Sequence, residues 1–197
     1  MTLATDAGDA LTAVVAAGVE LSAARLAEAT HDPWRVLSVA LSRDEAGPFA
    51  DVHASVAGDH YGSHFSFPGG SFLVLFSGKT GYLVTAAFTR GLQDRVENMP
   101  KREAVVLGEV SNVLLNGLVG HLANAWGLRL IISAPETGIS SPRDHLTRAV
   151  SRYREADPLA ATFFATLASP RLSSECRIML FLGRGLVSRL AGPAAAP

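Results

Sequence analysis

One segment of the chain combines an apolar core pattern with three polar side chains on a single side. Residues 107–136 contain Glu109, Asn112 and Asn116. If the segment is helical, the 3.6-residue repeat places these three side chains within about 60° of one another. A carboxylate can pair with a cation, and an amide can both donate and accept hydrogen bonds. This face therefore carries groups that could act on a bound partner.

The rest of this predicted helix favours a docking surface over an ordinary solvated face. Its opposite side is apolar and is expected to face the core. The neighbours of the three polar residues are small or medium-sized, with no Lys or Arg among them, whereas solvated helix faces usually carry long charged side chains. The expected core residues are Leu107, Leu114, Leu118, Leu122 and Ala125, and the neighbours on the polar side are Val105, Val113, Gly120 and Ala123.

Hydrophobic periodicity and turn residues predict the same order of elements twice. In the first half we expect a helix over 9–29 with Asp9 as its N-cap, a strand over 34–42, a hairpin of 64–67 with 71–76, and a helix over 79–92. A polar link, 93–101, follows. In the second half we expect a helix over 102–126, a strand over 128–134, a helix over 142–155, strands near 161–168 and 175–183, and a helix over 185–192.

Direct comparison of the two halves supports a duplication. At an offset of 96 residues, 23–29 align with 119–125, and at an offset of 105, 74–79 align with 179–184. We therefore expect one α+β domain over 1–197, built from pseudo-two-fold halves of about 9–92 and 103–192. Its sheet should be antiparallel with the long helices packed together. The tail, 193–197, is expected to be flexible.

Composition narrows the class of protein. The chain has 197 residues, a formal net charge of −1 and 48% hydrophobic residues, which describes a compact soluble domain large enough for a sizeable core. Nucleic-acid binding needs a basic surface and is not expected. The single cysteine fits a reducing compartment, and no uncharged apolar run reaches 18 residues. We expect a cytoplasmic protein without a membrane span.

Other motifs in the sequence give weaker indications of function. Residues 77–80, Ser-Gly-Lys-Thr, match the end of a phosphate-binding loop, but Leu73 stands where that loop needs its first glycine. The histidines at 53, 60 and 64 lack a cysteine or carboxylate cluster to complete a metal site. Cys176 precedes an apolar strand without a neighbouring base and is expected to be an inert, buried thiol.

The pattern Glu109-x-x-Asn112, followed by the segment 113–134 and then by Pro135, resembles the signature of the CheC/CheX/FliY family of chemotaxis phosphatases. The resemblance implies hydrolysis of the aspartyl phosphate on a CheY-like response-regulator receiver domain. It implies that Asn112 orients the attacking water and that Glu109 pairs with a receiver lysine. It also implies contacts to the partner from Asn116, Val105 and Gly120. No cofactor of the chain's own is implied, because the receiver supplies Mg²⁺; a CheD-like protein is a further partner of the family.

Two departures from the family pattern limit what it predicts. The position one helical turn before Glu109, often Asp or Ser in the family, is Val105. At the 96-residue offset the first half has Ala13 and Ala16 in place of the Glu and Asn, so one site is expected in place of two. The alternative is a catalytically inactive binding module of the same fold, for a receiver, a CheD-like protein or a motor component.

Overall fold

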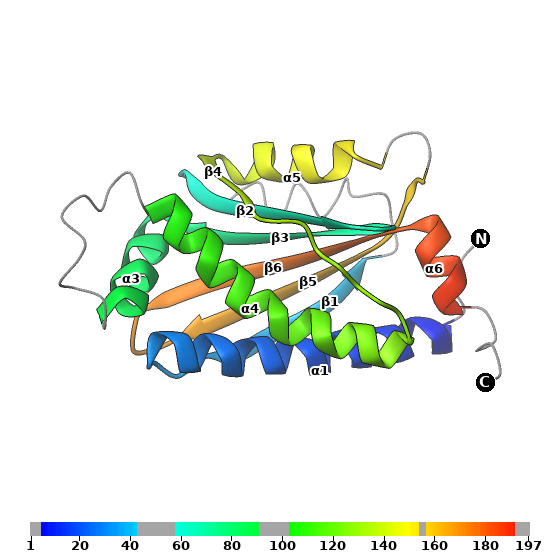
Figure 1. Ribbon diagram of the computed structural model, residues 1–197, viewed down its shortest axis with the longest axis horizontal. Coiled ribbons are helices and arrows are strands. Elements are labelled where there is room, and N and C mark those ends of the chain that lie inside the picture. Colours follow the sequence, from blue (N-terminus) through cyan, green and yellow to red (C-terminus); the bar gives the residue numbers. More distant parts are fainter. Residues whose placement is uncertain (1–4, 43–57, 91–102, 154–156, 192–197) are drawn as a thin grey trace.

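The computed structural model describes residues 5–42, 58–90, 103–153 and 157–191. They form one six-stranded antiparallel sheet and five helices of eight residues or more (Figure 1). The first half contains α1 (Thr5–Thr30), β1 (Arg35–Ser42), β2 (His60–Phe67), β3 (Gly70–Ser77) and α3 (Gly78–Thr89). The second half contains α4 (Glu103–Trp126), β4 (Glu136–Ser140), α5 (Pro142–Ser151), β5 (Leu159–Ser169), β6 (Ser174–Gly183) and α6 (Arg184–Ala191).

The order of strands in the sheet has two-fold symmetry. Neighbours run β1-β5-β6-β3-β2-β4, and every neighbouring pair is antiparallel. Exchanging β1 with β4, β2 with β5, and β3 with β6 gives the same order read backwards. The α+β class, the antiparallel sheet and the pseudo-two-fold plan are thus as predicted from the sequence. The predicted link over 93–101 and the tail lie outside the described residues.

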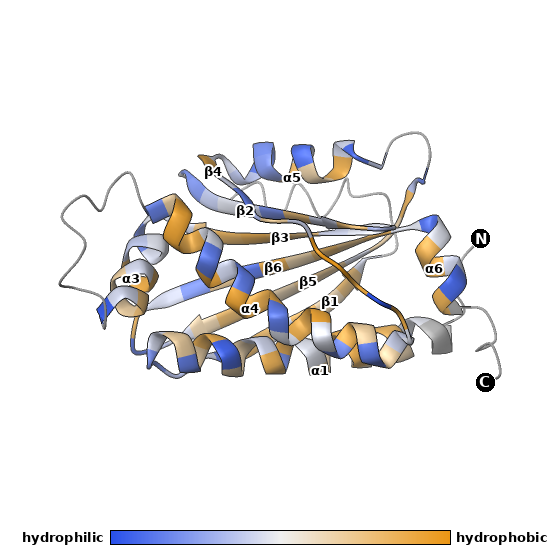
Figure 2. Cartoon of the chain, in the orientation of Figure 1, coloured by the Kyte–Doolittle hydropathy of each residue, from blue (hydrophilic) through white to orange (hydrophobic). Residues whose placement is uncertain are grey.

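The main core lies between one face of the sheet and the long helices. Helices α1 and α4 pack against each other and lie across this face, with α3 beside them (Figure 1). Alternate residues of β3, β5 and β6, such as Phe72, Phe163 and Leu180, enter this core with Leu26 and Leu114 of the helices. Figure 2 shows the consequence of this burial, with apolar residues recurring along the whole length of α1 and α4.

Two of these helices would also pass as membrane spans by length and composition alone. They are Gly8–Thr30 and Glu103–Trp126, whose 18-residue apolar windows are 39% and 50% buried inside the protein. Core helices of soluble proteins pass the same test, so this is weak evidence for a membrane span. The prediction that the chain has none remains a prediction.

The opposite face of the sheet is packed by α5. Leu146 and Ala149 of this helix pack against Leu73 and Phe181. A buried histidine pair adds a polar anchor, because His145 on α5 lies with Nδ1 3.2 Å from Nε2 of His64. The other ring nitrogen of His145 lies 3.1 Å from the carbonyl oxygen of His60.

Three details differ from the sequence predictions. Helix α1 begins at Thr5, so Asp9 lies inside it and is not its N-cap. Ala125 is exposed because the last turn of α4 extends past the core, where only Trp126 still packs on it. Residues 128–134 do not form the predicted strand; the second half has β4 at 136–140.

The segment at 128–134 keeps the alternation of a strand without its pairing. Leu128, Leu130 and Ile132 pack on the main core, while Ile131 between them is 61% exposed. The backbone crosses over the sheet and does not lie alongside a strand (Figure 1). Only Ser133, which donates its N–H to the carbonyl of Ser66 at 2.8 Å, makes a backbone hydrogen bond to the sheet. The alternation of apolar residues therefore predicted correctly which side chains are buried. It could not predict that no strand pairs with this segment.

Candidate functional site

Helix α4 presents the predicted site residues on its outer side. Leu107, Leu114, Leu118 and Leu122 have no exposed surface, as predicted from the periodicity. Glu109 and, one turn before it, Val105 are exposed; Val105 is 66% exposed. Asn116 and Gly120 continue the exposed side, and a Cβ at Gly120 would meet nothing within 4 Å. The outer side is therefore open to a large partner.

Asn112 is half-buried, and the helical repeat explains why. The repeat turns Asn112 about 60° away from Glu109, toward the side of the helix that carries the buried Val119 and Gly108. Its side chain thus stands at the border between core and solvent. Within the described residues the Asn112 amide has no hydrogen-bond partner in the protein. A half-sheltered, unengaged amide next to an exposed carboxylate is available to a bound molecule.

Pro135 reaches α4 directly beside the Glu/Asn pair. A Cβ placed at Gly108 would lie 3.5 Å from Cγ of Pro135 and 2.9 Å from Oγ1 of Thr137. The Thr137 hydroxyl is in turn 3.0 Å from that of Ser63 on β2. After leaving α4, the chain therefore returns across the sheet and packs on the turn that precedes Asn112. The spacing between Asn112 and Pro135 is the length of this return path.

Gly108 is a site-supporting residue that the sequence reasoning missed. A Cβ at this position would crowd the Thr137 hydroxyl, which would have to shift, and would be in van der Waals contact with Pro135. The available signal was a glycine in the middle of a predicted helix, which usually has a packing reason because glycine weakens helices. Gly108 is buried, unlike its neighbour Glu109.

The start of α4 is held by a tyrosine from the sheet. The hydroxyl of Tyr61 on β2 donates a hydrogen bond to the Glu103 carboxylate in the first turn. Partial burial and then the nearby Glu103 raise the pKa of Tyr61 to about 12, so the phenol keeps the proton that it donates. A Cβ at Gly81 of α3 would lie 2.6 Å from the Tyr61 ring, so α3 closes over this contact.

The position of the middle of α4 is fixed by a close crossing with α1. A Cβ at Gly117 would lie 3.0 Å from the carbonyl oxygen of Leu21, closer than most side chains approach a backbone. Leu21 and Gly117 are themselves related by the offset read from the sequence, and residues related by a two-fold can touch each other only near its axis. The contact therefore marks where the pseudo-two-fold passes, and it agrees with that offset.

Burial in α1 follows burial in α4 at this offset. Each buried position of α1 from Leu11 to Leu26 has a buried counterpart in α4. Glu109 corresponds to Ala13, which is exposed, and Asn112 to Ala16, which is half-buried. The first half thus has alanines where the second half has the Glu/Asn pair, although the exposed acids Asp9 and Glu20 correspond to Val105 and Asn116.

The structure gives little support for thiol or metal chemistry elsewhere in the described residues. Cys176 is fully buried in β6, and burial raises the pKa of its thiol, which disfavours the thiolate. No group of three or more His, Cys, Asp or Glu side chains in the described ranges is placed to hold a metal ion. His60 and His64 are buried strand residues that contact His145 of α5, and His53 lies outside the described ranges.

Comparisons with known proteins place this geometry in context. No family model and no curated protein sequence matches the chain. Among solved structures, FliY from Thermotoga maritima is similar, with a TM-score of 0.68, 14% identity and 96% of each chain covered. The chain has the fold of the CheC/CheX/FliY family. Recognition of this fold from the Glu-x-x-Asn spacing and the repeated halves is therefore confirmed.

One chain in each of two solved complexes has a similar fold. In the FliG–FliM complex from H. pylori the match has a TM-score of 0.63 and 8% identity, over 95% of this chain and 98% of that one. In the CheX–CheY–BeF3–Mg²⁺ complex from Borrelia burgdorferi the values are 0.53 and 11%, over 85% and 96%. The same fold therefore occurs both in a complex with CheY and in a complex with FliG.

Proposed function

We propose that the protein is a phosphatase that removes phosphate from the phosphorylated aspartate of a CheY-like receiver domain in chemotaxis or related two-component signalling. The observation that carries the proposal is the pair formed by the exposed Glu109 and the unengaged Asn112 amide on the outer side of α4. It is supported by the CheC-like fold and by the solved CheX–CheY complex of that fold.

The proposed reaction asks little of the phosphatase itself. Water attacks phosphorus, the bond between phosphorus and the aspartate oxygen breaks, and the products are a free carboxylate and inorganic phosphate. An acyl phosphate bound to Mg²⁺ is already activated, so the main remaining contribution is to position the water. The Asn112 amide accepts a hydrogen bond from that water and orients it. A hundredfold acceleration requires only about 2.7 kcal/mol.

The other site residues are assigned to recognition. Glu109 pairs with a receiver lysine and fixes the register of the two proteins. Val105, Asn116 and Gly120 are proposed to contact the receiver along the same side of α4. Because Gly120 has open space around it and the neighbours are small, a folded domain can approach this helix closely. Mg²⁺ is proposed to come from the receiver.

A binding module without catalysis is the second candidate. The occurrence of the fold in a FliG–FliM complex favours it, as do Val105 and the alanines at the counterpart site. Such a module would bind a receiver, a CheD-like protein or a motor component. It would have no need of the free amide of Asn112, and for this reason we favour the phosphatase.

The test is phosphate release from a panel of phosphorylated receiver domains, with and without the protein. Asn112→Ala is expected to remove most of the acceleration while changing the free energy of unfolding by no more than about 0.5 kcal/mol, as for a surface residue. Asn124→Ala, an exposed asparagine in the last turn of α4, is the matched control and should keep full activity. Unchanged turnover by folded Asn112→Ala would leave the binding module as the function.

A further inference from the structure

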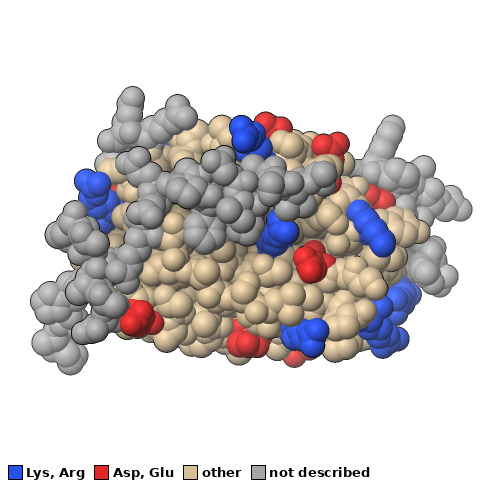
Figure 3. All heavy atoms as spheres, turned by 180° about the vertical axis from the view of Figure 1, so that it is seen from behind, with Lys and Arg blue, Asp and Glu red and all other residues tan. Residues whose placement is uncertain are grey.

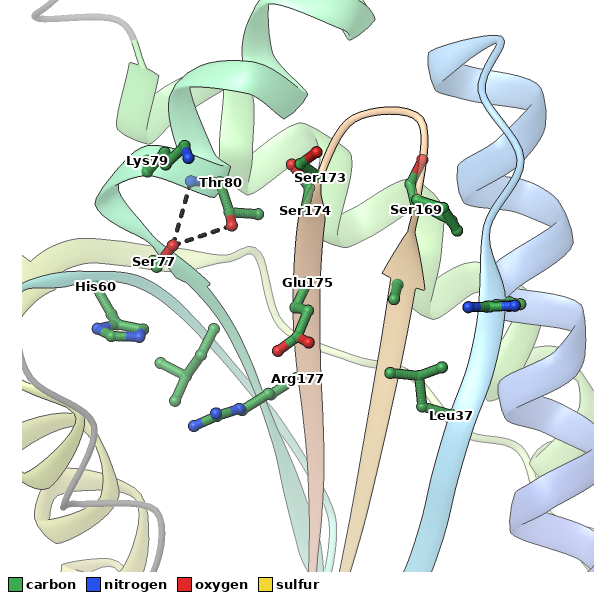
Figure 4. Close-up of a pocket in the computed structure, with 14 residues that line it drawn as sticks. Leu37, His60, Ser77, Lys79, Thr80, Ser169, Ser173, Ser174, Glu175 and Arg177 are labelled. Carbon is green, nitrogen blue, oxygen red and sulfur yellow. Dashed lines mark hydrogen bonds between the residues drawn. The ribbon is translucent and has the colours of Figure 1, made fainter.

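A concave site lies on the sheet face opposite α1 and α4. It is a cavity of about 520 Å³ at the end of the sheet where α3 begins. This volume is within the range of pockets that hold small molecules. Its walls come from β1, β2, β3, β5, β6, the β5–β6 turn and the first turn of α3 (Figure 4). The sheet separates it from the Glu109 surface.

The register of the sheet places charged side chains in this cavity. Arg35 on β1 pairs with Ala168 on β5, and Ala168 pairs with Glu175 on β6. Arg35 and Glu175 are thus two strands apart, about 10 Å between Cα atoms. Arg177 lies two residues from Glu175 on the same face of β6, and Lys79 lies in the first turn of α3 (Figure 4). Basic groups therefore flank one carboxylate on several sides.

The same arrangement is visible on the molecular surface. Figure 3 looks onto the sheet face opposite α1 and α4, where Lys and Arg side chains surround an isolated acidic group and much of the remaining described surface is uncharged. Three cations and one carboxylate line the cavity, which leaves it with a positive balance.

These cations lack the ion pairs that other arginines of the protein have. Arg148 and Arg152 both pair with Glu136, and Arg171 pairs with Asp32. No ion pair within the described ranges involves the cavity residues Arg35, Lys79 or Arg177, although Glu175 lines the same cavity. Unpaired cations in one cavity favour a bound anion.

Arg177 is the most constrained of the three. Its Nη1 is shielded from solvent and has no hydrogen-bond partner in the part of the chain that the structure describes. A buried, unsatisfied donor costs about 1–3 kcal/mol and more when charged, so an acceptor at this point is favourable. The neighbouring His60 does not compete with Arg177 for an anion. Burial and then Arg177 lower the pKa of His60 and keep its ring neutral.

We propose that this cavity binds a small molecule with two phosphate groups at opposite ends, of the sugar-bisphosphate class. Glu175 between the cations excludes negative charge from the centre, so anionic groups bind at the edges, beside Arg35 and beside Arg177 and Lys79. The cavity offers the Glu175 carboxylate to a hydroxyl group and the half-exposed, apolar Leu37 to carbon. Phosphate esters carry up to two charges each at neutral pH, which matches unpaired guanidinium groups.

The helix terminus contributes little to this site. Ser77 accepts the N–H of Thr80 at 3.2 Å and donates to the Thr80 hydroxyl at 3.0 Å (Figure 4). The N–H of Gly78 donates to the carbonyl of Asp59. The Ser-Gly-Lys-Thr segment is therefore a capped helix start and not a backbone cradle for phosphates, and recognition must come from the side chains.

The experiment is isothermal titration of the full chain with fructose 1,6-bisphosphate, fructose 6-phosphate, citrate, inorganic phosphate and sulfate. We expect one site per chain and binding of the bisphosphate at least tenfold tighter than the monophosphate. Arg177→Gln and Arg35→Gln should each weaken it about tenfold, which corresponds to 1.4 kcal/mol. Glu175→Gln should tighten it, because it removes the like charge and keeps an acceptor.

Controls separate a site from general charge. Arg189→Gln on α6 changes the net charge equally but lies away from the cavity and should leave binding unchanged. Lys79→Gln replaces an exposed residue and tests the cavity if Arg177→Gln fails to fold. Equal weakening by Arg189→Gln, equal affinity for bisphosphate and monophosphate, or no saturable binding up to about 10 mM, well above a millimolar Kd, would each overturn the proposal.

Discussion

At the scale of single residues, Glu109 and Asn112 differ in exposure in a way that suits two different roles. Glu109 is exposed and can reach a charged group on a partner, whereas Asn112 is half-buried, on the side of α4 that also carries Val119. Exposed charge pairs mostly affect encounter and affinity. A sheltered amide has fewer competing waters and a narrower range of orientations. We therefore expect substitutions at the two positions to act on different kinetic parameters.

For Glu109→Ala we expect KM for the phosphorylated receiver to rise about tenfold while kcat changes little, because uniform binding is lost. The difference from the unmodified protein should shrink at high salt, which screens exposed charges. Steady-state phosphate release over a range of receiver concentrations measures both parameters. Glu20→Ala, an exposed glutamate of α1, is the control. A fall in kcat at unchanged KM would assign Glu109 to the chemical step instead.

The residues that the sequence identified well are those whose environment follows from the helical repeat alone. Leu114, Leu118 and Leu122 are predicted and observed in the core. Gly108 was missed because its role depends on Pro135, which returns to α4 along a path that no local pattern describes. Asn112 is half-buried for a different reason, since the buried side of α4 is wider than its leucine stripe and extends to Gly108 and Val119.

At the scale of elements, the crossing of α1 and α4 controls where the site faces. For Gly117→Val we expect a loss of about 1–3 kcal/mol in the free energy of unfolding, because the new side chain meets the backbone of Leu21 and forces the helices apart. Gly120→Val has open space and should stay within about 0.5 kcal/mol. Urea unfolding of both variants measures the difference; equal stability would mean that the helices do not approach this closely.

The docking of α5 is expected to depend on pH through the histidine pair. Burial, then His145 and the nearby Arg148 lower the pKa of His64 to about 3. Since the unfolded chain binds this proton near pH 6.5 and the folded chain does not, stability is complete above about 6.5 and falls as pH drops toward 3. The free energy of unfolding then changes by up to about 1.4 kcal/mol per pH unit for each such histidine.

The measurement is the urea midpoint between pH 7 and pH 5, above most carboxylate titration. His64→Leu removes one titrating group and should make the dependence on pH shallower. His31→Asn changes an exposed histidine whose φ of 54° asparagine also tolerates, and should leave the slope unchanged. A slope in His64→Leu as steep as in the unmodified protein would show that the pair is not what makes the fold sensitive to acid.

At the scale of the whole molecule, the duplication and the antiparallel sheet could be predicted from the sequence, whereas the order of the strands could not. Repeated element order and two offsets predicted the two-fold plan, because each offset aligns corresponding elements of the two halves. The interleaving of the halves in the order β1-β5-β6-β3-β2-β4 needed the structure, since strand pairing is non-local. The same holds for the basic cavity, whose Arg35 and Arg177 come from strands far apart in the sequence.

A two-fold fold with one Glu/Asn pair makes a prediction about stoichiometry. The α1 and α4 faces correspond at the offset read from the sequence, but Ala13 and Ala16 offer neither charge nor amide. We expect one receiver, activated by beryllofluoride, to bind per chain, as measured by titration calorimetry, and Glu109→Lys to remove that binding through charge repulsion. Ala13→Glu in an Asn112→Ala background should restore no turnover, because Ala16 cannot orient water. Two receivers per chain, or binding that survives Glu109→Lys, would place recognition on a surface other than α4.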